Sequence, residues 1–292
     1  MKKITELKNP LSENIDKMSI SEILDLINNE DENLSRQIRK KNPDLEQVIN
    51  VIINAFKNGG RLLYVGCGSS GRLGVLDAAE CPPTFSVSKY LVQGIIAGGN
   101  KALYQSIEGA EDDFNQGQIA IEKKKVNSND VVFGISANGS AKFVLGALKY
   151  AKKNKAYTSL LTFNNIDNIA YVDKIISIVV GPEIISGSTR MKAGTATKMI
   201  LNMITTTSMI KINKTYKNYM VDLKISNQKL LDRGIRIISE ITGLNYKKSE
   251  NLLINSKNNV KVAILMEVKK ISYNTAFKKL KLNNGNLRKA LN

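Results

Sequence analysis

Apolar residues in the middle of the chain occur in short uninterrupted runs, separated by stretches with an apolar residue at every third or fourth position. The runs are rich in β-branched residues and do not alternate with polar ones, which is typical of strands buried on both faces of a parallel sheet. Five runs are predicted strands: Leu62–Val65, Val92–Ala97, Val131–Ile135, Ser159–Phe163 and Ile175–Val180. The helical period predicts five helices: Leu73–Ala79, Lys101–Gly109, Gly117–Lys124, Ala141–Lys152 and Lys192–Ile210. This alternation predicts an α/β fold that binds ligands beyond the carboxyl ends of its strands.

The two ends of the chain show only the helical period. Near the N-terminus, residues 19–28 place four apolar side chains on one stripe, and residues 45–56 repeat the pattern before a Gly-Gly pair; the stripe consists of Ile20, Ile23, Leu24 and Ile27. After about Val221, Asn245 and Ser272 are predicted N-caps. A further helical stripe contains Val260, Ala263, Ile264 and Val268. We expect three regions: an N-terminal helical segment packed on the core over residues 1–52, an α/β domain over 53–216 and a small all-helical domain over 217–292.

Composition excludes several classes of protein. A chain of 292 residues with 42% hydrophobic residues can bury a substantial core. The first seventeen residues lack the apolar segment of a secretory signal, and no run of eighteen apolar residues occurs, so no membrane span is expected. The two cysteines and the absence of histidine argue against a zinc site and favour free thiols in a reducing cytoplasm. We expect a cytoplasmic protein.

The formal net charge of +17 is typical of some nucleic-acid-binding proteins. The lysines, however, are spread along the chain, and no arginine-rich or aromatic-interleaved patch accompanies them. We therefore expect no nucleic-acid partner. The charge favours anionic substrates instead.

The segment Gly66–Gly71 follows the first predicted strand and leads into a helix. Its glycines let the backbone approach a ligand, and the amides of a helix start together with the Ser69 and Ser70 hydroxyls suit a phosphate group. A dinucleotide is a weaker interpretation, because Ala97-Gly98-Gly99 stands where an acidic residue would close the second strand. A strand-to-helix turn without any ligand is the remaining alternative.

Two further loops combine glycines with hydroxyls. The loop after the third strand contains Ser136, Asn138 and Ser140, and the loop before the long helix contains Ser186, Ser188, Arg190 and Lys192. Single loops of this kind are common, but three in one sheet are not. We expect them to converge on one anion, with Gly68, Ser69 and Ser70 from the first loop.

In a chain without histidine, carboxylates are the first candidates for acid–base chemistry. Glu80 stands at the expected end of a helix, directly before Cys81-Pro82-Pro83. Glu108, Glu111 and two aspartates gather in an expected loop. Solvated carboxylates are the ordinary alternative at both places. Next to phosphate loops, they point to acid–base catalysis on a sugar phosphate.

Several segments together resemble the N-acetylmuramic acid 6-phosphate etherase family, in the glucokinase-regulator-like branch of the sugar isomerase (SIS) superfamily. They are GCGSSGRLGVLDAAECPPTF, IIAGG, EGAED, GPEIISGSTRMKAGTATKMILN and MVDL. The resemblance covers nearly the whole chain. It implies a SIS-type αβα sandwich with a five-stranded parallel sheet, followed by a UBA-like helical domain.

The resemblance also implies a cytoplasmic lyase of cell-wall recycling, which cleaves a D-lactyl ether from the sugar phosphate without a metal or redox cofactor. It implies a homodimer with active sites at the subunit interface. The family pattern assigns the general acid to Glu80 and the base at C2 to Glu111. A non-catalytic sugar-phosphate sensor and an amino-sugar-phosphate isomerase are the alternatives. The second loop departs from the usual Ser-Gly-Arg-Thr-Pro run, because this chain has Asn138-Gly139-Ser140-Ala141-Lys142.

Overall fold

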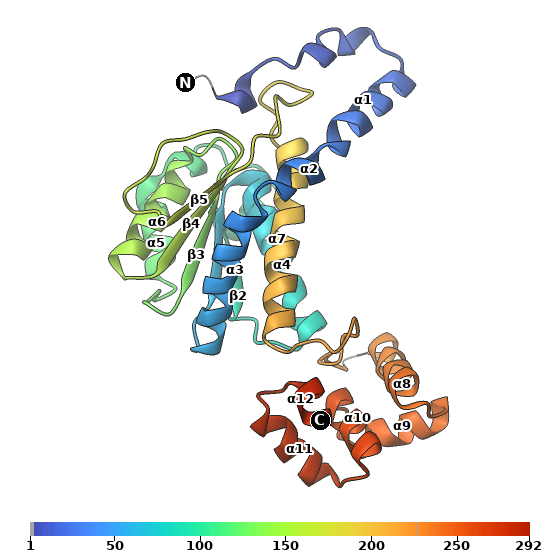
Figure 1. Ribbon diagram of the computed structural model, residues 1–292. Coiled ribbons are helices and arrows are strands. Elements are labelled where there is room, and N and C mark those ends of the chain that lie inside the picture. Colours follow the sequence, from blue (N-terminus) through green and yellow to red (C-terminus); the bar gives the residue numbers. More distant parts are fainter. Residues whose placement is uncertain (1–2, 226) are drawn as a thin grey trace. The chain divides into compact units, whose positions relative to one another are not determined.

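The computed structural model describes residues 3–225 and 227–292. The chain forms two compact units (Figure 1). The first unit runs to Ala79 and resumes over Lys89–Thr205, and the second joins Glu80–Ser88 to Thr206–Asn292. The domain boundaries drawn from the sequence, after residues 52 and 216, stay a prediction.

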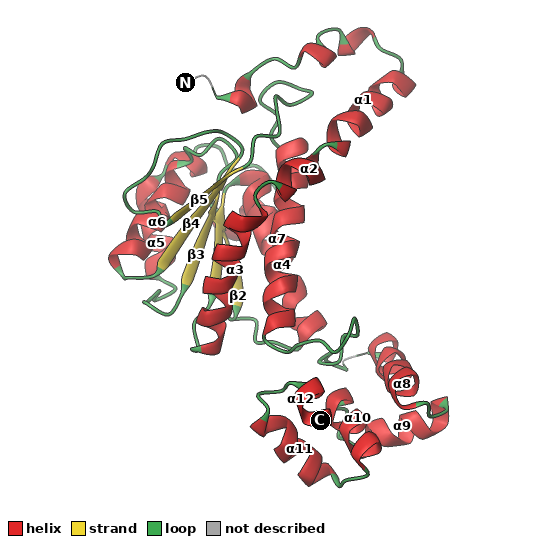
Figure 2. Cartoon of the chain, viewed as in Figure 1, coloured by secondary structure: helices red, strands yellow, loops and turns green. Residues whose placement is uncertain are grey.

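The first unit contains a five-stranded, all-parallel sheet in the order β2-β1-β3-β4-β5 (Figure 2). Its strands are β1 Leu62–Gly66, β2 Val92–Ile96, β3 Val131–Ile135, β4 Tyr157–Thr162 and β5 Lys174–Ser177. Every residue of β1 and β3 is buried, as the uninterrupted apolar runs predicted. The predicted parallel sheet is confirmed, with strand ends shifted by up to three residues.

Helices cover both faces of the sheet (Figure 1). α3 (Asn42–Lys57), α4 (Gly68–Phe85) and α7 (Lys192–Lys211) lie on one face, and α5 (Phe114–Glu122) and α6 (Lys142–Lys153) on the other. Val144, Ala147 and Leu148 of α6 pack with Val132 and Leu160 of the sheet in one core cluster. The predicted αβα sandwich is therefore confirmed.

The helix predicted over Lys101–Gly109 is wrong. This stretch holds only a short 3-10 turn, η4 (Gly99–Leu103), followed by loop and by a second short turn, η5 (Ala110–Asp112). Gly98, Gly99 and Gly109 all adopt positive φ, between 67° and 81°. A right-handed helix cannot include that conformation, so the backbone turns at each end of the stretch.

α4 does not end at Glu80, as the sequence analysis expected. It continues through Pro82 and Pro83 to Phe85, which places Glu80 inside the helix. The two prolines lack the amides that would bond to the carbonyls four residues earlier, which weakens this last turn without ending it. The amide of Ser86 still donates to the Pro82 carbonyl (3.0 Å) and closes the helix.

The N-terminal segment contains η1 (Ile4–Glu6), η2 (Pro10–Ser12), η3 (Ile15–Lys17), α1 (Ile20–Glu32) and α2 (Leu34–Arg39). Ser19 and Glu22 form a capping box that starts α1. The predicted helix is confirmed, but no residue of α1 is buried. Ile20 and Leu24 of the predicted stripe are 78% and 55% exposed.

The second unit consists mainly of helices: α8 (Gln228–Thr242), α9 (Tyr246–Asn255), α10 (Val260–Lys269), α11 (Tyr273–Leu282) and α12 (Leu287–Leu291). The predicted N-caps Asn245 and Ser272 accept hydrogen bonds from the Lys248 and Thr275 amides. Of the predicted stripe, Val260, Ala263 and Ile264 are buried, whereas Val268 is exposed. Within the described residues, no helix has both the length and the apolar character that a membrane crossing requires.

Candidate functional site

The first glycine loop joins β1 to α4, as predicted. β1 ends at Gly66 and α4 begins at Gly68, which has a positive φ of 50°. A Cβ atom on Gly66 would lie 2.6 Å from the Gly71 amide nitrogen, so no larger residue fits this turn. Ser69 and Ser70 occupy the first turn of α4 and are half-buried. The loop therefore offers the start of a long helix and two hydroxyls to an anion.

The acidic segment lies beside this loop. A cavity of about 170 Å³ is lined by Cys67, Gly68 and Arg72 on one side and by the stretch from Ser106 to Glu111 on the other. The guanidinium of Arg72 donates from Nη2 to the Gln105 carbonyl (3.0 Å). Glu111 and the first glycine loop, about forty residues apart in sequence, thus share one cavity.

The other acids of the segment have local partners. Glu108 accepts from the Ser106 hydroxyl (2.8 Å), and Asp113 is the N-cap of α5, accepting from the Gln116 amide (2.9 Å). Asp112 lies 3.7 Å from the Lys142 ammonium, an exposed pair that contributes little. The expected acidic loop is confirmed.

The Cys67 thiol reports on the electrostatics of this cavity. Burial, together with the nearby charges of Glu111 and Asp112, raises its pKa to about 12. A thiol with that pKa stays protonated at neutral pH and is a poor nucleophile. Cys67 is therefore better suited to packing than to nucleophilic catalysis.

The second loop leaves the same edge of the sheet, because Ile135 at the end of β3 pairs with Gly66 at the end of β1. The Ser136 hydroxyl donates to Asn138 Oδ1 (3.1 Å), and the Ser140 amide donates to the same oxygen (3.0 Å). The Lys3 ammonium donates to the Ser140 hydroxyl (2.6 Å). Asn138 therefore shapes the loop with its carbonyl oxygen, and its amide group is the part suited to an anion.

The third loop makes different contacts from those expected of a phosphate site. The amides of Lys192 and Ala193 at the start of α7 donate to the two carboxylate oxygens of Glu183 (2.9 and 3.0 Å). Glu183 is fully buried, and burial raises its pKa against the opposing effect of these amides. The buried Lys192 ammonium pairs with Glu30 of α1. A carboxylate of the chain itself thus caps this helix start.

Ser186 and Ser188 also bond to other parts of the chain. The Ser186 hydroxyl donates to the Glu6 and Leu7 carbonyls (both 3.4 Å), and the Ser188 amide donates to the Ile185 carbonyl (2.9 Å). Among the described residues that line the Glu111 cavity, none comes from the third loop. Substrate binding by Ser186, Ser188 and Lys192 stays a prediction.

Glu80 lies on α4 and is exposed to solvent. Twelve residues of continuous helix separate it from Gly68 at the start of α4. At a rise of 1.5 Å per residue this amounts to about 18 Å along the helix axis, which exceeds the length of a hexose 6-phosphate.

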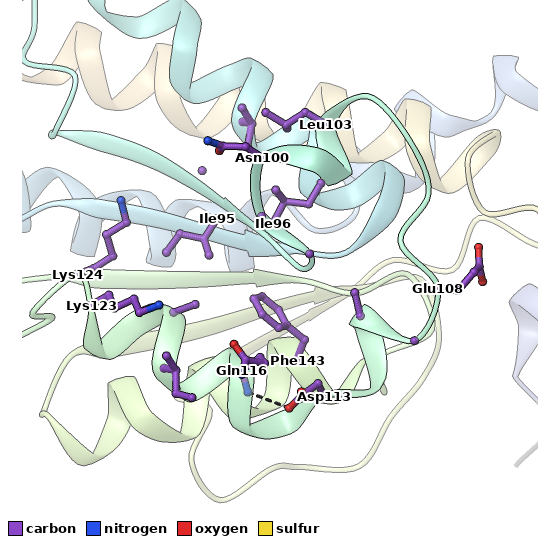
Figure 3. Close-up of a pocket in the computed structure, with 18 residues that line it drawn as sticks. Ile95, Ile96, Asn100, Leu103, Glu108, Asp113, Gln116, Lys123, Lys124 and Phe143 are labelled. Carbon is purple, nitrogen blue, oxygen red and sulfur yellow. Dashed lines mark hydrogen bonds between the residues drawn. The ribbon is translucent and has the colours of Figure 1, made fainter.

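A larger cavity of about 900 Å³ lies beside the edge strand β2 (Figure 3), and it shares Glu108, Gly109 and Ala110 with the smaller one. Ile95, Ile96, Leu103 and Phe143 form much of its wall, and Lys123 and Lys124 lie at one end (Figure 3). Its described lining includes none of the predicted phosphate-binding or catalytic residues. Of the predicted site residues, Gly68 and Glu111 line the smaller cavity instead.

Sequence reasoning overlooked Arg72. It is the fifth residue of α4, two positions after Ser70, and lines the Glu111 cavity. The sequence does contain a feature that could have identified it, namely a cationic side chain two residues after Ser70.

Two family models match the chain. Residues 44–152 match the glucokinase regulatory protein N-terminal SIS domain, and residues 217–278 match the C-terminal lid domain of glucokinase regulatory protein. A putative sugar-phosphate isomerase from Listeria monocytogenes is a similar solved structure, with a TM-score of 0.49 and 15% identity over 68% of this chain and 94% of that one.

Curated relatives match over nearly the full length. The N-acetylmuramic acid 6-phosphate etherase of Actinobacillus pleuropneumoniae serotype 7 is 47% identical over 99% of this chain and 96% of its own. N-acetylmuramic acid 6-phosphate etherase 1 of Bacillus licheniformis is 48% identical over 98% and 95%. The Staphylococcus epidermidis etherase is 46% identical over 99% and 98%. With this identity over both the α/β and the helical parts, the chain belongs to the N-acetylmuramic acid 6-phosphate etherase family.

Proposed function

We propose that this protein cleaves the D-lactyl ether bond of N-acetylmuramic acid 6-phosphate, yielding N-acetylglucosamine 6-phosphate and D-lactate. The observation that carries the proposal is the identity of 46–48% to three etherases over 98–99% of the chain. The cavity that joins the first phosphate loop to Glu111 gives it a physical basis. We expect the reaction to occur in the cytoplasm, during recycling of cell-wall sugars.

The proposed reaction is an elimination followed by addition of water. In the ring-opened sugar, the C2 hydrogen lies next to an aldehyde, and Glu111 removes it as a proton. The C2–H electron pair forms a C2–C3 double bond as the C3–O bond to lactate breaks. Glu80 gives its proton to the departing oxygen. Water then adds across the C2–C3 double bond: its hydroxyl joins C3 as the Glu80 carboxylate takes its proton, and Glu111 returns its proton to C2. The reaction therefore starts with Glu111 ionised and Glu80 protonated, and it ends in the same state.

The phosphate is proposed to bind at Gly68, Ser69 and Ser70, with Ser136, Asn138 and Ser140 of the neighbouring loop completing the site. Both loops leave the same edge of the sheet from adjacent strands. Helix-start amides and hydroxyls are suited to phosphate oxygens. Binding by the Ser186 hydroxyl would require its present contacts to the Glu6 and Leu7 carbonyls to change, and binding by the Lys192 ammonium would require its pairing with Glu30 to change.

We further propose that the active form is a homodimer in which Glu80 of a second copy faces Glu111. Within one helix, Glu80 lies about 18 Å from the start of α4, too far to act on a sugar whose phosphate binds there. The cavity of about 170 Å³ is also smaller than most ligand sites, which measure roughly 300–1,000 Å³. A second copy would supply Glu80 as the general acid, and its surface would enlarge the enclosed site.

The test follows D-lactate release and deuterium incorporation at C2 in deuterated water. For Glu111→Gln we expect both to fall by at least about 10²-fold, because the base at C2 is lost. For Glu80→Gln we expect lactate release to fall by a similar factor while C2 exchange continues. Glu122→Gln, an exposed carboxylate on α5, is the matched control and should keep both activities.

Continued C2 exchange in Glu111→Gln would refute that residue's assignment. Absence of lactate release from the unaltered protein would refute the etherase function itself. Mixing the Glu80→Gln and Glu111→Gln variants tests the shared site, since a mixed dimer regains one site with both carboxylates. No recovery of lactate release on mixing would argue against a site built from two copies.

A regulatory role is the second candidate. The two matching family models are named for glucokinase regulatory protein, which supports sugar-phosphate binding without turnover as an alternative. A regulator would bind the substrate and release no lactate. The same assay, combined with a binding measurement, distinguishes the two.

A further inference from the structure

Arg72 lies at the meeting point of the phosphate loop and the acidic segment. It is the fifth residue of α4, close in sequence to Ser69 and Ser70, and lines the cavity that also contains Glu111. Among the described residues of that lining, it is the one cation. Its side chain is partly buried, and its Nη2 is held by the Gln105 carbonyl at 3.0 Å.

The bond to Gln105 directs the guanidinium toward the acidic segment. Gln105 immediately precedes the stretch from Ser106 to Glu111 that forms the opposite wall of the cavity. The arginine therefore extends from the phosphate loop toward the side on which the proposed base lies. A guanidinium has five donors, so it can keep this bond and still bind an anion.

The proposed substrate carries two anionic groups. One is the phosphate on C6, for which the glycine loops supply amides and hydroxyls. The other is the carboxylate of the lactyl group on C3, the carbon next to C2. If Glu111 removes the proton at C2, the lactyl carboxylate lies on the Glu111 side of the cavity. Arginine is the side chain best suited to a carboxylate, because its planar fork donates two parallel hydrogen bonds.

We propose that Arg72 binds the carboxylate of the D-lactyl group and thereby selects ether-bearing sugar phosphates over those with a free C3 hydroxyl. The proposal rests on the etherase function proposed above. Arg72 takes no proton and forms no covalent bond. It is a specificity residue that orients the group that leaves.

The experiment compares two ligands that differ in the lactyl group, N-acetylmuramic acid 6-phosphate and N-acetylglucosamine 6-phosphate. Affinities are measured by calorimetry in the Glu111→Gln background, where turnover is expected to stop. Adding Arg72→Gln should weaken binding of the muramic acid ligand by about 10- to 100-fold, the effect of losing a charge-assisted hydrogen bond. Binding of the glucosamine ligand should change by less than about twofold.

Arg72→Lys is the conservative variant, because it keeps the positive charge and loses the two parallel N–H donors of the guanidinium. It should recover part of the affinity for the muramic acid ligand and leave the glucosamine ligand unaffected. Arg233→Gln, an exposed arginine on α8, is the matched control and should alter neither affinity. Thermal unfolding of each variant checks that the fold is kept.

An equal loss of affinity for both ligands in Arg72→Gln would place the arginine on the phosphate and overturn the proposal. Unchanged affinity for both would overturn it as well. Because these are binding measurements, they are independent of turnover. A protein that discriminates between the ligands through Arg72 yet releases no lactate would refute the etherase function and leave the carboxylate contact supported.

Discussion

At the scale of single residues, Cys67 offers a direct probe of the cavity. Its thiol lines the same cavity as Glu111, and burial followed by the Glu111 and Asp112 charges raises its pKa to about 12. A neutral side chain at position 111 removes one of the charges that oppose thiolate formation. The reactivity of the Cys67 thiol therefore measures how close Glu111 lies to it.

We expect Glu111→Gln to lower the pKa of Cys67 and to speed its alkylation by iodoacetamide at pH 9 by roughly 2- to 10-fold, corresponding to less than one pKa unit. Peptide mass spectrometry separates Cys67 from the buried Cys81. Glu122→Gln is again the control. Equal alkylation rates for the unaltered protein and Glu111→Gln would contradict the shared cavity.

At the scale of elements, a buried carboxyl group joins α4 to α7. Asp77 of α4 accepts from Asn202 Nδ2 (2.7 Å) and from the Thr205 hydroxyl (3.2 Å), both on α7. Burial raises the pKa of Asp77, and the hydrogen bonds from Asn202 and Thr205 oppose this only in part. The folded state therefore favours the protonated carboxyl more than the unfolded chain does.

This raised pKa predicts a pH-dependent stability. The stabilising contribution of protonated Asp77 is complete below the unfolded pKa near 3.8 and is lost as pH rises through the folded pKa. Asp77→Asn keeps an oxygen that can accept both hydrogen bonds and does not titrate. We expect the free energy of unfolding of the unaltered protein, relative to Asp77→Asn, to fall between pH 4 and pH 8 in urea titrations. A difference that stays constant with pH would show that Asp77 keeps an ordinary pKa.

At the scale of the whole molecule, the net charge of +17 acts on a substrate with two anionic groups. A strongly basic protein attracts such a substrate over distances comparable to the Debye length, which salt shortens. The lysines are distributed over both units, so the effect belongs to the summed field and not to one contact.

We expect kcat/KM for lactate release to fall several-fold as potassium chloride rises from 10 to 300 mM, with kcat changing less. Lys278→Glu combined with Lys281→Glu reverses two exposed lysine charges on α11 and should reduce the salt dependence. A kcat/KM that is unaffected by salt would mean that the net charge does not contribute to substrate capture.

Sequence reasoning succeeded where the physical cause is local. The strands Leu62–Gly66 and Val131–Ile135 are uninterrupted apolar runs, and the turn after each is marked by glycine and serine. It could not anticipate distant partners. Substrate binding by Lys192 stays a prediction, but its ammonium pairs with Glu30, 162 positions away, and Glu183 caps the helix start beside it. The sequence around Lys192 and around Glu183 does not reveal these partners.

The strand–helix alternation, the glycine loops and the two candidate glutamates can be predicted from the order of residues, because hydrophobic period and turn chemistry act over a few residues. Three features depend on the folded chain: Glu111 and Arg72 share a cavity with the first loop, Glu80 lies inside a helix that continues through two prolines, and no residue of α1 is buried. These outcomes depend on which distant surfaces meet when the chain packs, and the order of residues along one segment does not contain that information.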